Sequence, residues 1–147
     1  MIQRIFEQFL KVHSVTTDTR KINQGDIFFA LKGGNFNGNT FAAKALEMGA
    51  SMVVIDEPQQ PHDDRMVLVE DVLTALQQVA KLYRESLKIP FLAITGSNGK
   101  TTTKELIRDV LAQRYRVSAT LGNVNNHIGD PLTLLAITAD GELAIVE

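Results

Sequence analysis

The chain has 147 residues, of which 44% are hydrophobic and 22% charged, with a formal net charge of −2 and no cysteine. These values are typical of a globular protein of one domain or two small ones, and they exclude a disulfide framework and a thiolate metal site. No apolar stretch approaches the roughly 20 residues of a membrane span, and the small net charge without basic clusters argues against nucleic acid as the main partner. We therefore expect a cytoplasmic protein with no membrane insertion.

The first part of the chain alternates between helical and extended patterns. In chain order, the residues predict a helix over 1–11, an extended piece over 15–17, a strand over 27–31, a loop over 32–39, a helix capped by Thr40 and ending at Gly49, a strand over 51–55, an exposed connection over 57–64, a strand over 66–69 and a long helix opened by Asp71. The long helix should bury one face, made of Val72, Leu76, Val79 and Tyr83. Strands that alternate with helices predict an α/β fold with a largely parallel sheet.

A domain boundary is predicted near Lys88, because Ile89-Pro90 ends the long helix. Beyond it the residues predict a strand over 91–94, a helix with apolar residues at 106, 107, 110 and 111, a strand over 116–121, a helix over 131–137 and a strand over 142–147. Three strands are fewer than a parallel nucleotide-binding sheet usually has. We therefore expect units over 1–88 and 89–147, the second of them truncated.

The segment between the strand over 91–94 and its following helix has the layout of a phosphate-binding loop. Gly96 and Gly99 can take backbone angles that turn N–H groups toward an anion, and the start of the helix adds to this. Lys100 would supply a charge for the phosphates, and the Thr101 hydroxyl would hold Mg²⁺. The predicted phosphate-binding residues are Gly96, Ser97, Asn98, Gly99, Lys100, Thr101 and Thr102. One departure is Ile94, where the general pattern has glycine. An ordinary helix-capping turn is the alternative, but it does not explain the lysine and three threonines together.

Three further groups of residues are candidates for binding. Arg20 and the glycine-containing segment that begins at Lys32 lie at strand ends. The forked guanidinium of an arginine together with loop N–H groups suits a diphosphate. The alternative is a solvated turn in which Arg20 bridges to Asp26. The asparagines at 123, 125 and 126 could contact sugar or phosphate oxygens, or simply form a turn and a helix cap. Glu147 ends a strand beside the phosphate loop, which suits a Mg²⁺ ligand.

Residues 95–102 read Thr-Gly-Ser-Asn-Gly-Lys-Thr-Thr, and after one further threonine they are followed by Lys-Glu. This segment resembles the ATP loop of the Mur ligases, which build the peptide of bacterial cell-wall precursors. The segment from Asp18-Thr19-Arg20 through Leu31-Lys32-Gly33 is similar to the N-terminal domain of this family, where serine is more usual than Thr19. Residues 123–135 are similar to the family members that add D-alanyl-D-alanine, although His127 and Asp130 depart from the usual pattern. The resemblance covers nearly the whole chain.

The resemblance implies a small N-terminal α/β domain, 1–88, that binds a UDP-sugar-peptide, and the incomplete first part of a central P-loop ATP-binding domain, 89–147. It implies ATP and Mg²⁺ as cofactors, with Lys100 as a catalytic residue and Thr101 and Glu147 as magnesium ligands. The implied substrate-binding residues are Thr19, Arg20, Lys32, Gly33, Gly34, Asn35 and Phe36 for the uridine diphosphate, and we add Asn125 and Asn126 as candidates.

The implied reaction has two steps. ATP phosphorylates the carboxylate of UDP-N-acetylmuramoyl-tripeptide, and the amine of D-alanyl-D-alanine then attacks the acyl phosphate. We expect this chain alone to lack ligase activity. We expect the longer protein of which it would be the N-terminal part to be a monomer. The alternatives are another Mur-type ligase, such as the enzyme that adds the third residue, a folylpolyglutamate synthase-like ligase, or a UDP-sugar-binding module without catalysis.

Overall fold

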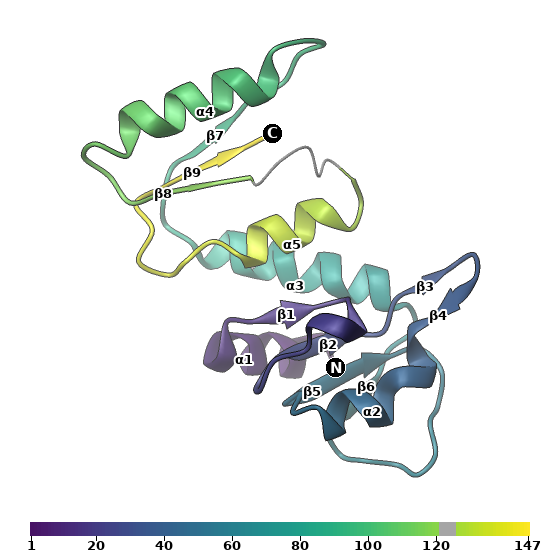
Figure 1. The fold of residues 1–147 in the computed structure, drawn as a ribbon. Helices are drawn as coiled ribbons and strands as arrows, with labels where there is room; N and C mark the ends of the chain where they lie inside the picture. Colours follow the sequence, from purple (N-terminus) through teal and green to yellow (C-terminus); the bar gives the residue numbers. More distant parts are fainter. Residues whose placement is uncertain (121–125) are drawn as a thin grey trace. The chain divides into compact units, whose positions relative to one another are not determined.

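Parallel strands form the sheet at the centre of each of the two units, Met1–Tyr83 and Arg84–Glu147, into which the chain divides. The computed structural model describes residues 1–120 and 126–147 (Figure 1). The predicted α/β class with parallel sheets is confirmed. Helix α3, Val72–Ser86, runs across the point where the units divide, so the functional boundary at residue 88 stays a prediction.

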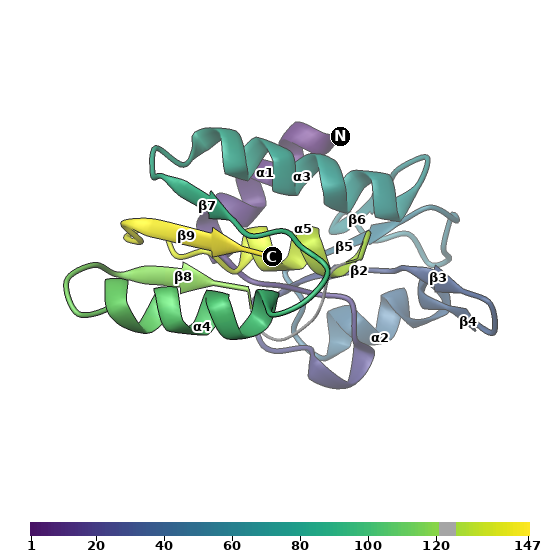
Figure 2. The same cartoon turned by 90° about the horizontal axis from the view of Figure 1, so that it is seen from above.

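The sheet of the first unit has four parallel strands in the order β1-β2-β5-β6. Their bounds are Val15–Thr16 for β1, Ile27–Phe29 for β2, Met52–Ile55 for β5 and Met66–Leu68 for β6. The central strands β2 and β5 are buried along their whole length. They are continuous apolar runs because helices cover both faces, with α1 and α3 on one side and α2 on the other (Figure 2).

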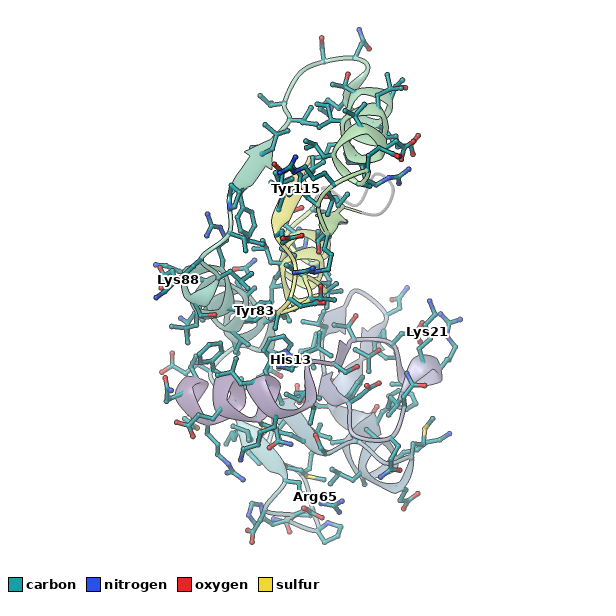
Figure 3. The ribbon with its side chains drawn as sticks, turned by 90° about the vertical axis from the view of Figure 1, so that its left-hand side faces the viewer. His13, Lys21, Arg65, Tyr83, Lys88 and Tyr115 are labelled. Atoms are coloured by element: carbon teal, nitrogen blue, oxygen red, sulfur yellow. The ribbon has the colours of Figure 1, made fainter. Side chains whose placement is uncertain are left out.

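Helices α1 and α3 of this unit each bury one face, and for α3 that face is the predicted one. In α1, Ile2–Val12, the fully buried residues are Ile5 and Phe9. In α3 all four predicted core residues are buried, and the Asp71 carboxylate accepts the Thr74 amide at 2.6 Å, as expected for a residue that opens a helix. The Tyr83 and Phe9 rings pack in a T-shaped arrangement with a centroid distance of 4.9 Å, and Tyr83 lies beside His13 (Figure 3). The spacing of apolar residues therefore predicted this side of the core correctly.

The segment over 32–39, predicted as a loop, forms a hairpin followed by a 3₁₀ turn. Strands β3, Lys32–Gly33, and β4, Phe36–Asn37, pair antiparallel across a two-residue turn of Gly34 and Asn35, residue types that such turns favour. The 3₁₀ helix η2, Gly38–Phe41, packs so closely that a Cβ on Gly38 would lie 2.6 Å from the Ala30 carbonyl carbon. The loop prediction was wrong because a segment rich in glycine and asparagine, which is typical of loops, here forms two short strands that pair with each other.

The predicted cap at Thr40 was also wrong. Helix α2, Ala42–Glu47, begins without a side-chain cap, and the Thr40 hydroxyl donates to the Asn37 carbonyl at 2.8 Å inside η2. The helix is shorter than predicted because the chain enters it through the 3₁₀ turn.

The second unit has a three-stranded parallel sheet in the order β7-β9-β8. Its elements are β7, Phe91–Ala93; α4, Lys100–Leu111; β8, Val117–Ala119; α5, Gly129–Leu135; and β9, Leu143–Val146. They match the predicted elements in type, with ends shifted by one or two residues. Leu121, the predicted last residue of the strand over 116–121, lies outside the described residues. Helices α4 and α5 lie on opposite sides of this sheet (Figure 1). None of the helices in the described part of the chain has both the length and the apolarity needed to cross a bilayer.

Candidate functional site

The segment between β7 and α4 has the backbone that the phosphate-loop prediction requires. Gly96 has a φ of +151° and Gly99 a φ of +77°, angles that residues with a Cβ rarely adopt. Apart from the chain neighbours, no heavy atom of the described residues lies within 4 Å of where a Cβ would stand on either glycine, so the need for glycine here comes from the backbone angle. Gly99 caps α4, and its carbonyl accepts the Thr103 amide at 2.9 Å. The helix therefore starts directly from the loop, with its positive end facing the exposed residues 96–98.

The Lys100 side chain folds back over this loop. Its Nζ donates to the Gly96 carbonyl at 2.7 Å. The ammonium group therefore lies at the exposed glycine turn and not along the outer face of α4. A cation in this position can meet an anion that the loop binds, and its role in phosphate binding stays a prediction.

The end of β9 brings Glu147 to the first turn of α4. Strand β9 is the central strand, and Val146 is in register with Ala93 of β7, immediately before the loop. The Thr101 hydroxyl lies 3.2 Å from each carboxylate oxygen of Glu147. The two predicted magnesium ligands, 46 residues apart, are thus close in space. Their metal-binding role stays a prediction.

Lys104 is a third member of this cluster, and sequence reasoning assigned it no function. Its Nζ lies 3.0 Å from Glu147 Oε2, and the side chains are only 3% and 0% exposed. The hydrogen bond from Lys104 lowers the pKa of Glu147 against the opposing effect of burial, and the hydroxyl of Thr101 adds to the lowering. The signal available in the sequence was the spacing, because Thr101 and Lys104 are three residues apart and share one face of a helix.

Thr120 fixes the backbone at this end of β9. It is 3% exposed, and its hydroxyl donates to the Ile145 carbonyl at 3.3 Å while it accepts the Glu147 amide at 3.2 Å. Thr120 therefore fixes the backbone of Glu147, while Thr101 and Lys104 contact its carboxylate.

The donor set of this cluster fits Mg²⁺ with a nucleotide. A hydroxyl and a carboxylate are hard oxygen ligands, and Mg²⁺ is commonly held by one or two carboxylates together with substrate phosphates and water. No group of three or more histidine, aspartate or glutamate side chains gathers for a metal in the described ranges 1–120 and 126–147. A metal at Thr101 and Glu147 would thus take further ligands from a phosphate and water.

In the first unit, Arg20 pairs with Asp18 and not with Asp26. The guanidinium donates to the Asp18 carboxylate at 3.0 and 2.9 Å, so the suggested bridge to Asp26 was wrong; Asp26 instead accepts the Asn23 amide at 2.8 Å. The bond from Arg20 lowers the pKa of Asp18 to about 2. Arg20 itself remains 84% exposed. The pair orients the guanidinium at the surface, where it can still meet an anion.

Arg20 borders a pocket of about 290 Å³ beside η1, Thr19–Lys21. The lining residues are Thr19, Arg20, Ile22, Phe41, Lys44, Ala45 and Met48. Lys44 gives the pocket a second cation that sequence reasoning missed. Phe41 stacks on Phe36 of the hairpin with a centroid distance of 5.4 Å, so the predicted residue Phe36 adjoins the pocket through Phe41.

We predict that Arg20→Gln raises the pKa of Asp18 from about 2 toward its ordinary 3.8, because the charged hydrogen bonds are lost. A carboxyl ¹³C NMR titration measures this directly. Asp63 is an internal control, because Arg65 lowers its pKa to about 2 in the same way, and this value should not change. An Asp18 pKa that stays at about 2 would contradict the assignment to Arg20.

Lys32 is held by carboxylates that follow β5. Its Nζ lies 2.8 Å from Asp56 and 2.9 Å from Glu57, and the hydrogen bonds to both raise its pKa. Sequence reasoning missed these two acids and expected Lys32 to point toward a diphosphate. The hairpin residues Gly33, Gly34, Asn35 and Phe36 are exposed, so this network positions the hairpin while leaving its turn accessible.

Asn39 connects the hairpin to these acids. It is fully buried; its amide group donates to Asp56 at 2.8 Å and to Asn37 at 2.9 Å, and its oxygen accepts the amides of Asp56 and Glu57. Asn37 in turn donates to Glu57 at 2.8 Å. A single buried side chain thus ties the hairpin to the end of β5.

Of the three candidate asparagines after β8, Asn123 and Asn125 lie outside the described residues. The Asn126 side-chain oxygen accepts the amides of Ile128 and Gly129 at 3.0 and 2.7 Å, at the start of α5. These bonds form a turn that leads into α5, whose N-cap residue is Ile128, and this agrees with the turn named as part of the alternative. A substrate contact by Asn126 stays a prediction and would use its amide nitrogen.

Comparisons with known proteins give consistent results over both units. The profile described as Mur ligase family, catalytic domain, matches residues 11–84, and the profile described as Mur ligase middle domain matches residues 94–147. The UDP-N-acetylmuramoyl-tripeptide--D-alanyl-D-alanine ligase of Bacillus subtilis is 49% identical over 138 residues, which are 92% of this chain and 30% of that protein. The ligase of the same name from Escherichia coli is 37% identical over 94% of this chain and 30% of its own length.

A solved structure agrees with these relatives. The MurF ligase from Thermotoga maritima in complex with ADP matches with a TM-score of 0.83 and 31% identity, over 94% of this chain and 32% of that one. The chain therefore spans about 30% of the length of the curated relatives it matches.

Proposed function

Because this chain belongs to the Mur ligase family, we propose that it supplies the nucleotide-binding parts of a ligase that uses ATP to join D-alanyl-D-alanine to UDP-N-acetylmuramoyl-tripeptide. The names of its relatives support these substrates, and the ADP complex of a related structure supports ATP. Residues 89–147 would bind ATP and residues 1–88 the uridine diphosphate. We also propose a cytoplasmic location.

The chemistry of such a ligase explains why an ATP loop is needed. A carboxylate is a poor electrophile, and phosphorylation gives it a leaving group that an amine can displace. Lys100 would offset the charge that develops on the transferred phosphoryl group, and the loop amides at the start of α4 would orient it. Bound Mg²⁺ would neutralise phosphate charge, and the oxygens of Thr101 and Glu147 would hold it.

In the first unit, the pocket beside Arg20 suits the uridine diphosphate. Arg20 and Lys44 offer two cations for the diphosphate, and Phe41 offers an apolar surface. The exposed hairpin turn would contact the same ligand through its backbone N–H groups. These roles extend the proposal to Thr19, Arg20 and residues 33–36, and they add Lys44.

The observation that carries the proposal is the contact of Thr101 with Glu147 beside a glycine turn closed by Lys100. We predict that the chain binds Mg-ADP and, separately, UDP-N-acetylmuramoyl-tripeptide in calorimetric titrations, each with one site. Binding of Mg-ADP should fail when EDTA removes the metal. A chain that binds the UDP compound but no nucleotide would support a UDP-sugar-binding module, and a chain that binds neither would contradict the proposal.

A further inference from the structure

Among the described residues of the second unit, the most deeply buried charges belong to one ion pair, Lys104 with Glu147. Their side chains are 3% and 0% exposed, and Lys104 is the buried residue of α4, a helix whose outer face leaves Leu106 63% and Val110 71% exposed. Burying an ammonium group is costly unless it is paired, whereas a buried leucine would stabilise the packing of α4 without that cost. A lysine in this place therefore points to a role tied to its partner, Glu147.

The contacts of Glu147 differ between its two oxygens. Lys104 Nζ approaches Oε2 at 3.0 Å, whereas Thr101 Oγ1 is 3.2 Å from both Oε1 and Oε2. Because Thr101 and Lys104 lie one turn apart on the same helix, the ammonium group and the hydroxyl reach the carboxylate from neighbouring positions. An oxygen that accepts a charged hydrogen bond from Lys104 is less available to a metal. The carboxylate is thus arranged to offer chiefly Oε1 to a metal at Thr101.

Ca²⁺ and Mg²⁺ differ in how many oxygens of one carboxylate they tend to bind. Ca²⁺ accepts six to eight oxygens in flexible geometry and often takes both oxygens of one carboxylate, whereas Mg²⁺ demands an octahedron and keeps several waters. A carboxylate restricted to one oxygen therefore suits Mg²⁺ better than Ca²⁺.

We propose that Lys104 is a positioning residue that holds one oxygen of Glu147, restricts the carboxylate to one-oxygen ligation, and thereby selects Mg²⁺ over Ca²⁺. This inference rests on the proposed function, because it takes the metal to bind with a nucleotide at Thr101 and Glu147. Lys104 acts through Glu147 and contacts neither the nucleotide nor the metal.

The test compares Lys104→Met with the unaltered chain. Calorimetry gives the Kd of ADP in the presence of MgCl₂ and of CaCl₂, and the ratio of the two values reports selectivity. In the unaltered chain Mg²⁺ should support the tighter binding. In Lys104→Met we expect Mg²⁺-supported affinity to fall about 10-fold or more, the size of effect seen when the partners of metal ligands are removed, while Ca²⁺-supported affinity falls much less. The matched control is Lys88→Met, an exposed lysine of the same unit, which should leave both values unchanged.

The outcomes separate this inference from the proposed function. Equal losses with both metals would show a purely structural role and would overturn the inference alone. Failure of the unaltered chain to bind ADP with either metal would overturn the inference and the proposed ATP site together.

A second measurement needs no variant and can overturn the inference even if Lys104→Met does not fold. In the unaltered chain, the ammonium protons of Lys104 can be followed by NMR through the ¹⁵N resonance of the group. These protons should stay protected from exchange with water when Mg-ADP is added, because the ion pair persists. Loss of that protection on addition of Mg-ADP would show that the metal displaces Lys104 and would overturn the inference.

Discussion

Replacing Lys100 with alanine is expected to weaken the binding of Mg-ADP by about 10- to 100-fold, because a hydrogen bond to a charged group is worth about 1.5 to 3 kcal/mol. Lys100 already lies across the glycine turn, where its ammonium group contacts the Gly96 carbonyl. A phosphate in the loop would exchange this carbonyl contact for a charged one. Calorimetry or equilibrium dialysis with labelled ADP measures the change.

The control for Lys100→Ala is Lys88→Ala, which removes an exposed lysine outside the loop and should leave ADP affinity unchanged. Circular dichroism of both variants checks that the fold is kept. If Lys100→Ala bound Mg-ADP as tightly as the unaltered chain, the assignment of the loop as a phosphate site closed by this lysine would be wrong.

Asn39→Ala is expected to lower the free energy of unfolding by about 2 to 4 kcal/mol, because each buried polar group left without a partner costs about 1 to 3 kcal/mol. Asn39 is fully buried and serves the amides of Asp56 and Glu57 as well as the side chains of Asp56 and Asn37. Urea unfolding followed by circular dichroism measures the loss. Under conditions where the variant is folded, its affinity for UDP-N-acetylmuramoyl-tripeptide should also fall, because the hairpin is no longer tied to β5.

Asn35→Ala provides the matched comparison for stability. Asn35 lies in the turn of the same hairpin, but it is exposed, and its removal should change the free energy of unfolding by no more than about 0.5 kcal/mol. Equal effects of the two substitutions would show that Asn39 does not hold the hairpin in place.

The elements with a strong periodic pattern could be predicted without the structure. Helix α3 buries Val72, Leu76, Val79 and Tyr83 as their spacing requires, because one helix face must be removed from water whatever the rest of the chain does. The glycine angles in the phosphate loop were equally predictable, since Gly96 and Gly99 have positive φ values in a strand-to-helix turn. The hairpin over 32–37 was missed, because its two short strands pair across a turn and show no periodicity of their own.

The residue types along the chain determined the parallel α/β class and the loop before α4, since both follow from local patterns of apolar residues and glycine. Only the tertiary structure decided which charges meet. The partners Lys104 and Glu147, like Lys32 and Asp56, come from different elements, 43 and 24 residues apart in the chain, and nothing in the local pattern of either pair specifies the other member. They meet because the order of strands in a sheet fixes which element ends lie side by side, and that order depends on the packing of the whole unit.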